Sequence, residues 1–235
     1  MRLFCFPYAG GSAQIHRQWG KALPQEVDVC SVQLPGRGNR LAEPAYTRLP
    51  QLVEACLEGL GSFFDRPFAF FGHSMGAMIS FELTRLLRRN KRQLPAQIFL
   101  SGRTAPEFSN DAKKTYDLPD PEFIAELKNL NGTPQELLAN EELMQLMLPI
   151  LRADFEICQT YEYVDESPLD RPISVYGGLE DEYIGRDEFD AWRSQTTSHF
   201  ILKMFAGGHF FLHSAEDLLL RVLAAELEEL LSTIR

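Results

Sequence analysis

The pentapeptide Gly72-His73-Ser74-Met75-Gly76 places a serine between two glycines, a spacing that suits nucleophilic chemistry. An apolar run at residues 68–71 precedes it and a helix-like pattern at 77–89 follows. A Gly-x-Ser-x-Gly turn between a strand and a helix strains the serine backbone and keeps neighbouring side chains away from the hydroxyl. We therefore expect Ser74 to be a nucleophile; the alternative is a glycine-rich turn that happens to contain a serine.

A base must accompany this serine, because a serine hydroxyl is a weak nucleophile. The chain has five histidines. His209 follows Gly207-Gly208 directly after the last expected strand, at the sheet edge where Ser74 is also expected. His213 is the alternative, but it lies closer to the next helix and is expected to cap or pack there. The sequence favours His209 as the base.

An acid should orient that base, and in chain order it should come between the serine and the histidine. An expected strand at residues 173–176 is followed by Gly177-Gly178 and then by three carboxylates, Glu180, Asp181 and Glu182. The residues by themselves leave all three open as the acid. They also leave open a loop of solvated charges without a catalytic role.

Two N–H donors are needed to stabilise an oxyanion. The N–H of Met75, at the start of the helix after the serine, is the first candidate. The second is expected in the glycine-containing loop at residues 7–12, unless Gly10-Gly11 is only a structural turn. This loop has neither the ending of a P-loop nor the spacing of a dinucleotide-binding fingerprint.

Short apolar runs alternate with helical patterns, which is typical of a mainly parallel sheet covered by helices on both faces. We expect strands near residues 2–6, 27–33, 68–71, 97–100, 173–176 and 199–205. We expect helices near residues 14–23, 49–64, 77–89, 187–195 and 215–231.

Residues 104–170 interrupt this alternation of strands and helices and divide the core into two parts, 1–103 and 171–235. The interval is too long for a crossover and contains no convincing strand, so we expect a helical insertion. At the carboxyl edge of the sheet it would form a lid over the active site or an acyl-binding subdomain; the alternative is a packing hairpin without gating. The insertion has more apolar residues than one buried helix face requires: Leu143, Met144, Leu146, Met147, Ile150 and Leu151. Some of them are expected to line the acyl channel, the methionines first, because a flexible thioether adapts to varied chains.

Composition excludes several classes of protein. The 235 residues are 45% hydrophobic and carry a net charge of −10, which argues against a nucleic-acid partner. No apolar run approaches the roughly 20 residues needed to span a bilayer, and the first residues lack the pattern of a signal peptide, so we expect a cytoplasmic protein.

The basic cluster at residues 85–92 is expected to be solvated and to complement a helix C-terminus. Four widely spaced cysteines are expected to be buried free thiols and not metal ligands: Cys5, Cys30, Cys56 and Cys158.

With these residues in place, the chain resembles the type II thioesterases, the stand-alone editing enzymes of non-ribosomal peptide and polyketide synthesis, and the related thioesterase that releases medium-chain fatty acids. The resemblance covers nearly the whole chain. The segments that carry it are residues 6–12, 34–37, 72–76, 101–103, 148–155, 177–181 and 207–211. The chain differs from the usual pattern of the family at Gly38 and Thr104, where such enzymes often have an acidic residue and a second arginine.

The resemblance implies an α/β-hydrolase fold and a Ser74–Asp181–His209 triad, with Ala9 and Met75 supplying the oxyanion N–H groups. It also implies that the inserted helices cover an acyl channel, and that the substrate arrives on the phosphopantetheine arm of a carrier protein. We expect a monomer without a metal or another cofactor and without a membrane partner.

Two other functions remain to be distinguished: a carboxylesterase acting on free small esters, and a non-catalytic binding protein on a hydrolase fold. Carrier proteins are commonly acidic, so docking to this acidic chain needs a local neutral, apolar or basic patch. Arg37 and Arg40 are the candidates for that patch.

Overall fold

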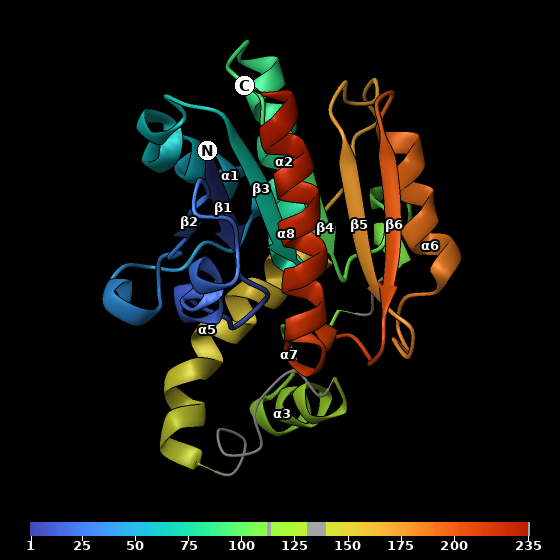
Figure 1. The fold of residues 1–235 in the computed structure, drawn as a ribbon. Coiled ribbons are helices and arrows are strands. Elements are labelled where there is room, and N and C mark those ends of the chain that lie inside the picture. The colour runs from blue at the N-terminus through green and yellow to red at the C-terminus, as the bar shows by residue number, and fades with distance from the viewer. Residues whose placement is uncertain (112–113, 131–139, 235) are drawn as a thin grey trace.

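A six-stranded parallel sheet forms the centre of the computed structural model, which describes residues 1–111, 114–130 and 140–234 (Figure 1). The spatial order of its strands is β2-β1-β3-β4-β5-β6. Their bounds are Arg2–Phe6 for β1, Asp28–Ser31 for β2, Phe68–His73 for β3, Ile98–Ser101 for β4, Ile173–Gly178 for β5 and Phe200–Phe205 for β6. Every expected strand is present, with its ends displaced by at most two residues.

The strands alternate their side chains between two apolar clusters, as the period of two in a β-strand requires. Phe4, Phe6 and Phe70 pack on one face beneath α1 (Leu49–Leu60) and α2 (Met75–Arg89). Leu3 and Phe71 pack on the opposite face, which α8 (Glu216–Thr233) covers (Figure 1). Burial of such large apolar side chains stabilises the fold by about 1.5–3 kcal/mol each. The expected sheet with helices on both faces is confirmed.

The remaining helices near the core are shorter than expected. The prediction for 187–195 corresponds to α6 (Arg186–Asp190) followed by a 3₁₀ turn (Ala191–Gln195), and α7 (Phe211–Ser214) precedes α8. The prediction of one helix at 14–23 is wrong. Two 3₁₀ turns, Ala13–His16 and Trp19–Lys21, occupy this segment. Their buried residues lie three apart, which imitated one face of an α-helix in the sequence pattern.

The insertion at 104–170 contains α3 (Asp120–Asn129) and α5 (Glu141–Gln159), and its described residues form no strand of the sheet. Residues 112–113 and 131–139 of the insertion lie outside the described part of the chain. An apolar cluster separate from both faces of the sheet joins the two helices. Its buried members are Phe123, Leu127, Met144, Leu148 and Leu151.

The helix α5 belongs partly to the insertion and partly to the core. Its residues from Met144 to Phe155 pack on α3, where the ring centroids of Phe155 and Phe123 lie 5.4 Å apart, whereas Ile157 near its end packs in the cluster covered by α1 and α2. Pro149 lies between the two halves and removes a backbone hydrogen bond there, which bends a helix. Figure 1 shows α5 changing direction along its length.

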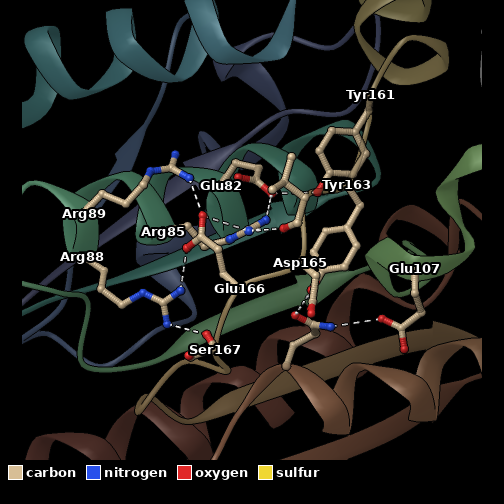
Figure 2. A network of polar contacts seen from close by, with 12 residues as sticks. Glu82, Arg85, Arg88, Arg89, Glu107, Tyr161, Tyr163, Asp165, Glu166 and Ser167 are labelled. Atoms are coloured by element: carbon tan, nitrogen blue, oxygen red, sulfur yellow. Dashed lines mark hydrogen bonds and ion pairs between the residues drawn. The ribbon is translucent and has the colours of Figure 1, made fainter.

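The basic cluster at the end of α2 is more buried than expected. The side chain of Arg85 is 3% exposed, and three guanidinium groups converge on the carboxylate of Glu166 in the segment that follows α5 (Figure 2). Arg89, Lys91 and Arg92 are exposed, so the expectation of a solvated cluster holds for these three and is wrong for Arg85. The three arginines paired with Glu166 are Arg85, Arg88 and Arg89.

All four cysteines have free thiols; Cys5 and Cys56 are buried, and Cys30 and Cys158 are half-buried. Burial raises the pKa of the Cys56 thiol to about 12 and that of Cys158 to about 11, so these thiols stay protonated at neutral pH. None of the helices in the described ranges has the length and apolar content needed to cross a bilayer.

Candidate active site

Ser74 occupies a sharp turn between β3 and α2, at the carboxyl edge of the sheet. Its φ of 53° and ψ of −111° lie in a region that non-glycine residues rarely adopt. A Cβ on Gly72 would overlap the carbonyl oxygen of Gly76, so only glycine lets the strand and the helix approach this closely. The backbone N–H of Ser74 donates to the carbonyl of Ser101 at 2.7 Å. The strained turn expected from the pentapeptide is present.

The side chains of His209 and Asp181 form a hydrogen bond, with Nδ1 of the imidazole 2.9 Å from Oδ2 of the carboxylate. The other carboxylate oxygen accepts the backbone N–H groups of Tyr183 at 3.0 Å and Ile184 at 3.3 Å. The Asp181 side chain is fully buried, and these donors offset the cost of removing its charge from water. Bonding at Nδ1 leaves Nε2 of His209 available for proton transfer.

The other two carboxylates left open by the sequence, Glu180 and Glu182, are exposed. The strand β5 continues through both glycines to Gly178, so the turn toward the histidine begins later than expected. The N–H of Glu180 donates to the carbonyl of Gly207 at 3.0 Å, which joins the loop after β5 to the loop after β6. This pairing of loops is what directs Asp181, and neither neighbour, toward His209.

The remaining histidines near the site make other contacts. His213 places Nε2 2.9 Å from the hydroxyl of Tyr8, in agreement with its expected packing role. His73 is buried with Nδ1 2.8 Å from Oγ of Ser101, and its ring centroid lies 5.3 Å from that of His209. Burial lowers the pKa of His73 well below its usual value, so its imidazole stays neutral.

Tyr8 and Ala9, in the loop after β1, line the same cavity as Ser74. The N–H of Gly11 donates to the carbonyl of Tyr8 at 2.9 Å. Because the peptide group between Tyr8 and Ala9 is planar and trans, the N–H of Ala9 points in the opposite direction from that carbonyl. Among the described residues, the Ala9 N–H has no hydrogen-bond acceptor. Met75 begins α2, and an N–H group in the first turn has no intrahelical acceptor.

A cavity of about 330 Å³ opens on Ser74 and His209. Its apolar wall comes from α3 and its C-terminal cap and from α5. The apolar residues of that wall are Leu127, Leu130, Leu151 and Phe155. Thr104, one of the two positions that differ from the family pattern, and Arg103 also line the cavity.

Methionine was the expected liner, and this prediction is wrong for the described cavity. Met144 is 3% exposed and packs with Met147 in the cluster between α3 and α5. Leu143 and Leu146 face solvent, with 46% and 50% of their surfaces exposed. Of the six apolar residues singled out in this helix, Leu151 alone lines the cavity as described. Helical spacing identifies an excess of apolar residues but does not show which of them meets a neighbouring helix.

Arg37 was expected in a docking patch at the entrance, and this is also wrong. Its side chain is 5% exposed and forms a bidentate ion pair with Asp154 of α5. Arg40 is 40% exposed but is paired with Glu43. The importance of Asp154 was missed in the sequence, although a lone carboxylate inside the apolar stretch at 148–155 is a signal that could have found it.

A protein-family model described as a thioesterase domain matches residues 1–227 of the chain. The chain belongs to the thioesterase family. Because the match covers almost the whole chain, the sheet, the serine turn and the insertion are all parts of the thioesterase domain.

Relatives of this thioesterase include two proteins whose names refer to gramicidins. The linear gramicidin dehydrogenase LgrE of Brevibacillus parabrevis is 47% identical over 232 residues, a match covering 97% of this chain and 88% of that protein. The gramicidin S biosynthesis protein GrsT of Aneurinibacillus migulanus is 43% identical over 232 residues, covering 99% and 91%.

The thioesterase also resembles solved structures over nearly its full length. The RedJ thioesterase from the prodiginine biosynthetic pathway of Streptomyces coelicolor matches with a TM-score of 0.90 and 36% identity, covering 96% of this chain and 85% of that chain. The type II thioesterase BorB from the borrelidin biosynthetic cluster matches with a TM-score of 0.88 and 36% identity, covering 96% and 92%. The thioesterase described here therefore has the α/β-hydrolase fold and is a thioester-cleaving enzyme.

Proposed function

We propose that Ser74, His209 and Asp181 form the catalytic triad of this thioesterase. The observation that carries the proposal is the 2.9 Å bond between His209 Nδ1 and Asp181 Oδ2, made beside the cavity that Ser74 and His209 both line. The bond fixes the imidazole tautomer in which Nε2 accepts a proton. The N–H groups of Ala9 and Met75 are the oxyanion donors.

In this mechanism, Ser74 Oγ attacks the thioester carbonyl while His209 Nε2 accepts the hydroxyl proton. The tetrahedral oxyanion is stabilised by the N–H groups of Ala9 and Met75. The carbon–sulfur bond then breaks and the thiol leaves with a proton from His209. Water, deprotonated by the same imidazole, attacks the acyl-enzyme and releases the carboxylic acid and Ser74. Asp181 orients His209 and stabilises its protonated form throughout.

The thioesterase acts in non-ribosomal peptide or polyketide biosynthesis, as indicated by the names of two further solved structures that it resembles, both from mixed pathways of this kind. Its substrate in this proposal is an aberrant acyl group on the phosphopantetheine arm of a carrier protein. The apolar wall from α3 and α5 supports this, because it can accept an acyl chain next to Ser74 while the insertion covers it as a lid. The enzyme works as a monomer.

One relative is named a dehydrogenase, and a carboxylesterase would use the same triad. The loop after β1, where a dinucleotide fingerprint would stand, has only Gly10-Gly11, which favours hydrolysis over redox chemistry. A comparison of substrates separates thioesterase from esterase. We expect kcat/KM for an octanoyl-pantetheine-loaded carrier protein to exceed that for ethyl octanoate by at least about 100-fold. Equal or reversed values would show that the carrier arm is not recognised and would favour the esterase.

The cavity wall predicts a change in chain-length preference. Leu130→Trp should lower kcat/KM for octanoyl carriers by at least about tenfold and that for acetyl carriers by less than about twofold. The larger ring occupies space that distal methylenes would fill, and each buried methylene contributes about 0.8 kcal/mol. Leu130 is half-buried and lines the cavity, so the substitution does not overpack a closed core.

Leu146→Trp is the matched control for this substitution, because Leu146 is 50% exposed on α5 and does not line the described cavity. It should leave both substrates unchanged. Circular dichroism checks the folding of each variant. An equal loss for acetyl and octanoyl carriers with Leu130→Trp would place the acyl chain elsewhere.

A further inference from the structure

A buried ion pair lies where the loop after β1 meets α5. Two nitrogens of the Arg37 guanidinium contact the two carboxylate oxygens of Asp154 at 2.6 and 2.7 Å. The two side chains are 5% and 1% exposed. Removing both charges from water costs roughly what their attraction returns, so such a pair does not by itself stabilise a fold much. The contacts it makes with the loop indicate another role.

Both partners of the ion pair hydrogen-bond to the backbone of the loop. The N–H of Gly10 donates to Oδ2 of Asp154 at 2.7 Å. The guanidinium of Arg37 donates to the carbonyl of Gly11 at 3.1 Å. Gly10 has a φ of +76°, and a Cβ there would lie 2.5 Å from the side chain of Leu151 on α5. The loop therefore lies directly against α5, in a conformation that favours glycine.

We propose that Arg37 and Asp154 are positioning residues that hold the N–H of Ala9 toward the reacting carbonyl. This rests on the proposed function, in which that N–H is an oxyanion donor. The N–H of Ala9 and the N–H of Gly10 belong to consecutive peptide groups, so fixing the second restricts rotation of the first. Without an acceptor at position 154, the Gly10 N–H would lose its partner and the loop could turn the Ala9 N–H away from the serine.

The charges of the pair also suit this position. A lone carboxylate beside the loop would repel the negative charge that develops on the substrate oxygen. The bidentate contact with Arg37 neutralises Asp154 while leaving Oδ2 able to accept the Gly10 N–H. Since Asp154 belongs to α5, the insertion contributes to oxyanion stabilisation as well as to the cavity wall.

Two double variants separate this role from general stability. Arg37→Met/Asp154→Asn and Arg37→Met/Asp154→Leu both remove the two charges, and they differ only in whether residue 154 can accept the Gly10 N–H. We expect kcat of the leucine variant to be about 10- to 100-fold below that of the asparagine variant, since loss of a whole oxyanion donor costs about 10²–10³. KM should differ by less than about threefold between them.

A tetrahedral inhibitor gives a second readout that a purely structural role would not change. Octylboronic acid forms a tetrahedral anion on a nucleophilic serine, so its affinity should fall by the same factor as kcat. Thermal unfolding measured by circular dichroism should be similar in the two variants. Values of kcat within about twofold of each other, or a loss confined to KM, would overturn the positioning role.

If the leucine variant does not fold, the wild type and the asparagine variant still decide the question. The acceptor then changes from a charged to a neutral oxygen, which roughly halves the strength of the hydrogen bond. We expect kcat to fall about three- to tenfold with KM unchanged, and equal kcat values would refute the proposal. Labelling of wild-type Ser74 by a fluorophosphonate tests the proposed triad separately. Unlabelled Ser74 refutes the triad, whereas labelled Ser74 with equal kcat values refutes only the positioning role.

Discussion

Ser74→Ala and His209→Ala should each lower the turnover of a carrier-bound thioester by about 10⁴- to 10⁶-fold. Either change removes the activated nucleophile, because the hydroxyl is unreactive without a base and the base has nothing to activate without the hydroxyl. The double variant should therefore be little worse than either single one. Single-turnover hydrolysis of an octanoyl carrier measures all three.

The control for this prediction is His213→Ala. His213 bonds to the hydroxyl of Tyr8 and not to Asp181, so turnover should stay within about tenfold of wild type. If the losses of the two single variants at Ser74 and His209 added up in the double variant, the two residues would not act as a unit. A loss at His213 as large as that at His209 would move the base to position 213.

Asp181→Asn should lower turnover by up to about 10⁴-fold. Asparagine keeps the shape of the side chain, but it favours the wrong imidazole tautomer and leaves the protonated imidazole unstabilised. Its oxygen can still accept the backbone N–H groups of Tyr183 and Ile184, so the loop should keep its conformation. Steady-state kinetics with an octanoyl carrier, together with a thermal unfolding curve, measure the two effects separately.

Glu180→Gln and Glu182→Gln are matched controls, since both residues adjoin Asp181 in the chain and both are exposed. Each should change turnover by less than about tenfold. Wild-type activity of Asp181→Asn combined with a large loss at either glutamate would assign the acid to that neighbour instead.

Local patterns made much of the fold predictable. A strand of a parallel sheet that is covered on both faces is a short continuous apolar run, so all six strands could be located from the sequence. The strained turn at Ser74 was predictable because the Gly-x-Ser-x-Gly spacing is local, and Gly72 is required by contact with the backbone of Gly76, whereas Gly76 is required by the backbone of Phe6 and Pro7. The prediction of a helix at 14–23 was wrong because the same periodic burial is also compatible with two successive 3₁₀ turns.

The candidate site was predictable to the extent that each residue follows its own strand. His209 could be placed at the carboxyl edge because it comes directly after the final strand of a parallel sheet. Choosing Asp181 among three carboxylates needed the family resemblance. Its contact with His209 depends on how the loops after β5 and β6 pair, and these loops are joined by hydrogen bonds that no local spacing specifies.

The sequence by itself determined the nucleophile turn, the order of strands and helices along the chain and the family, because these depend on local sterics, periodicity and ordered motifs. Only the tertiary structure decided which side chains meet across elements distant in the chain. Leucine and not methionine lines the cavity because α3 covers one face of α5. Arg37 is buried on Asp154 because α5 crosses the loop after β1, and close packing, unlike spacing, selects a single partner for each buried charge.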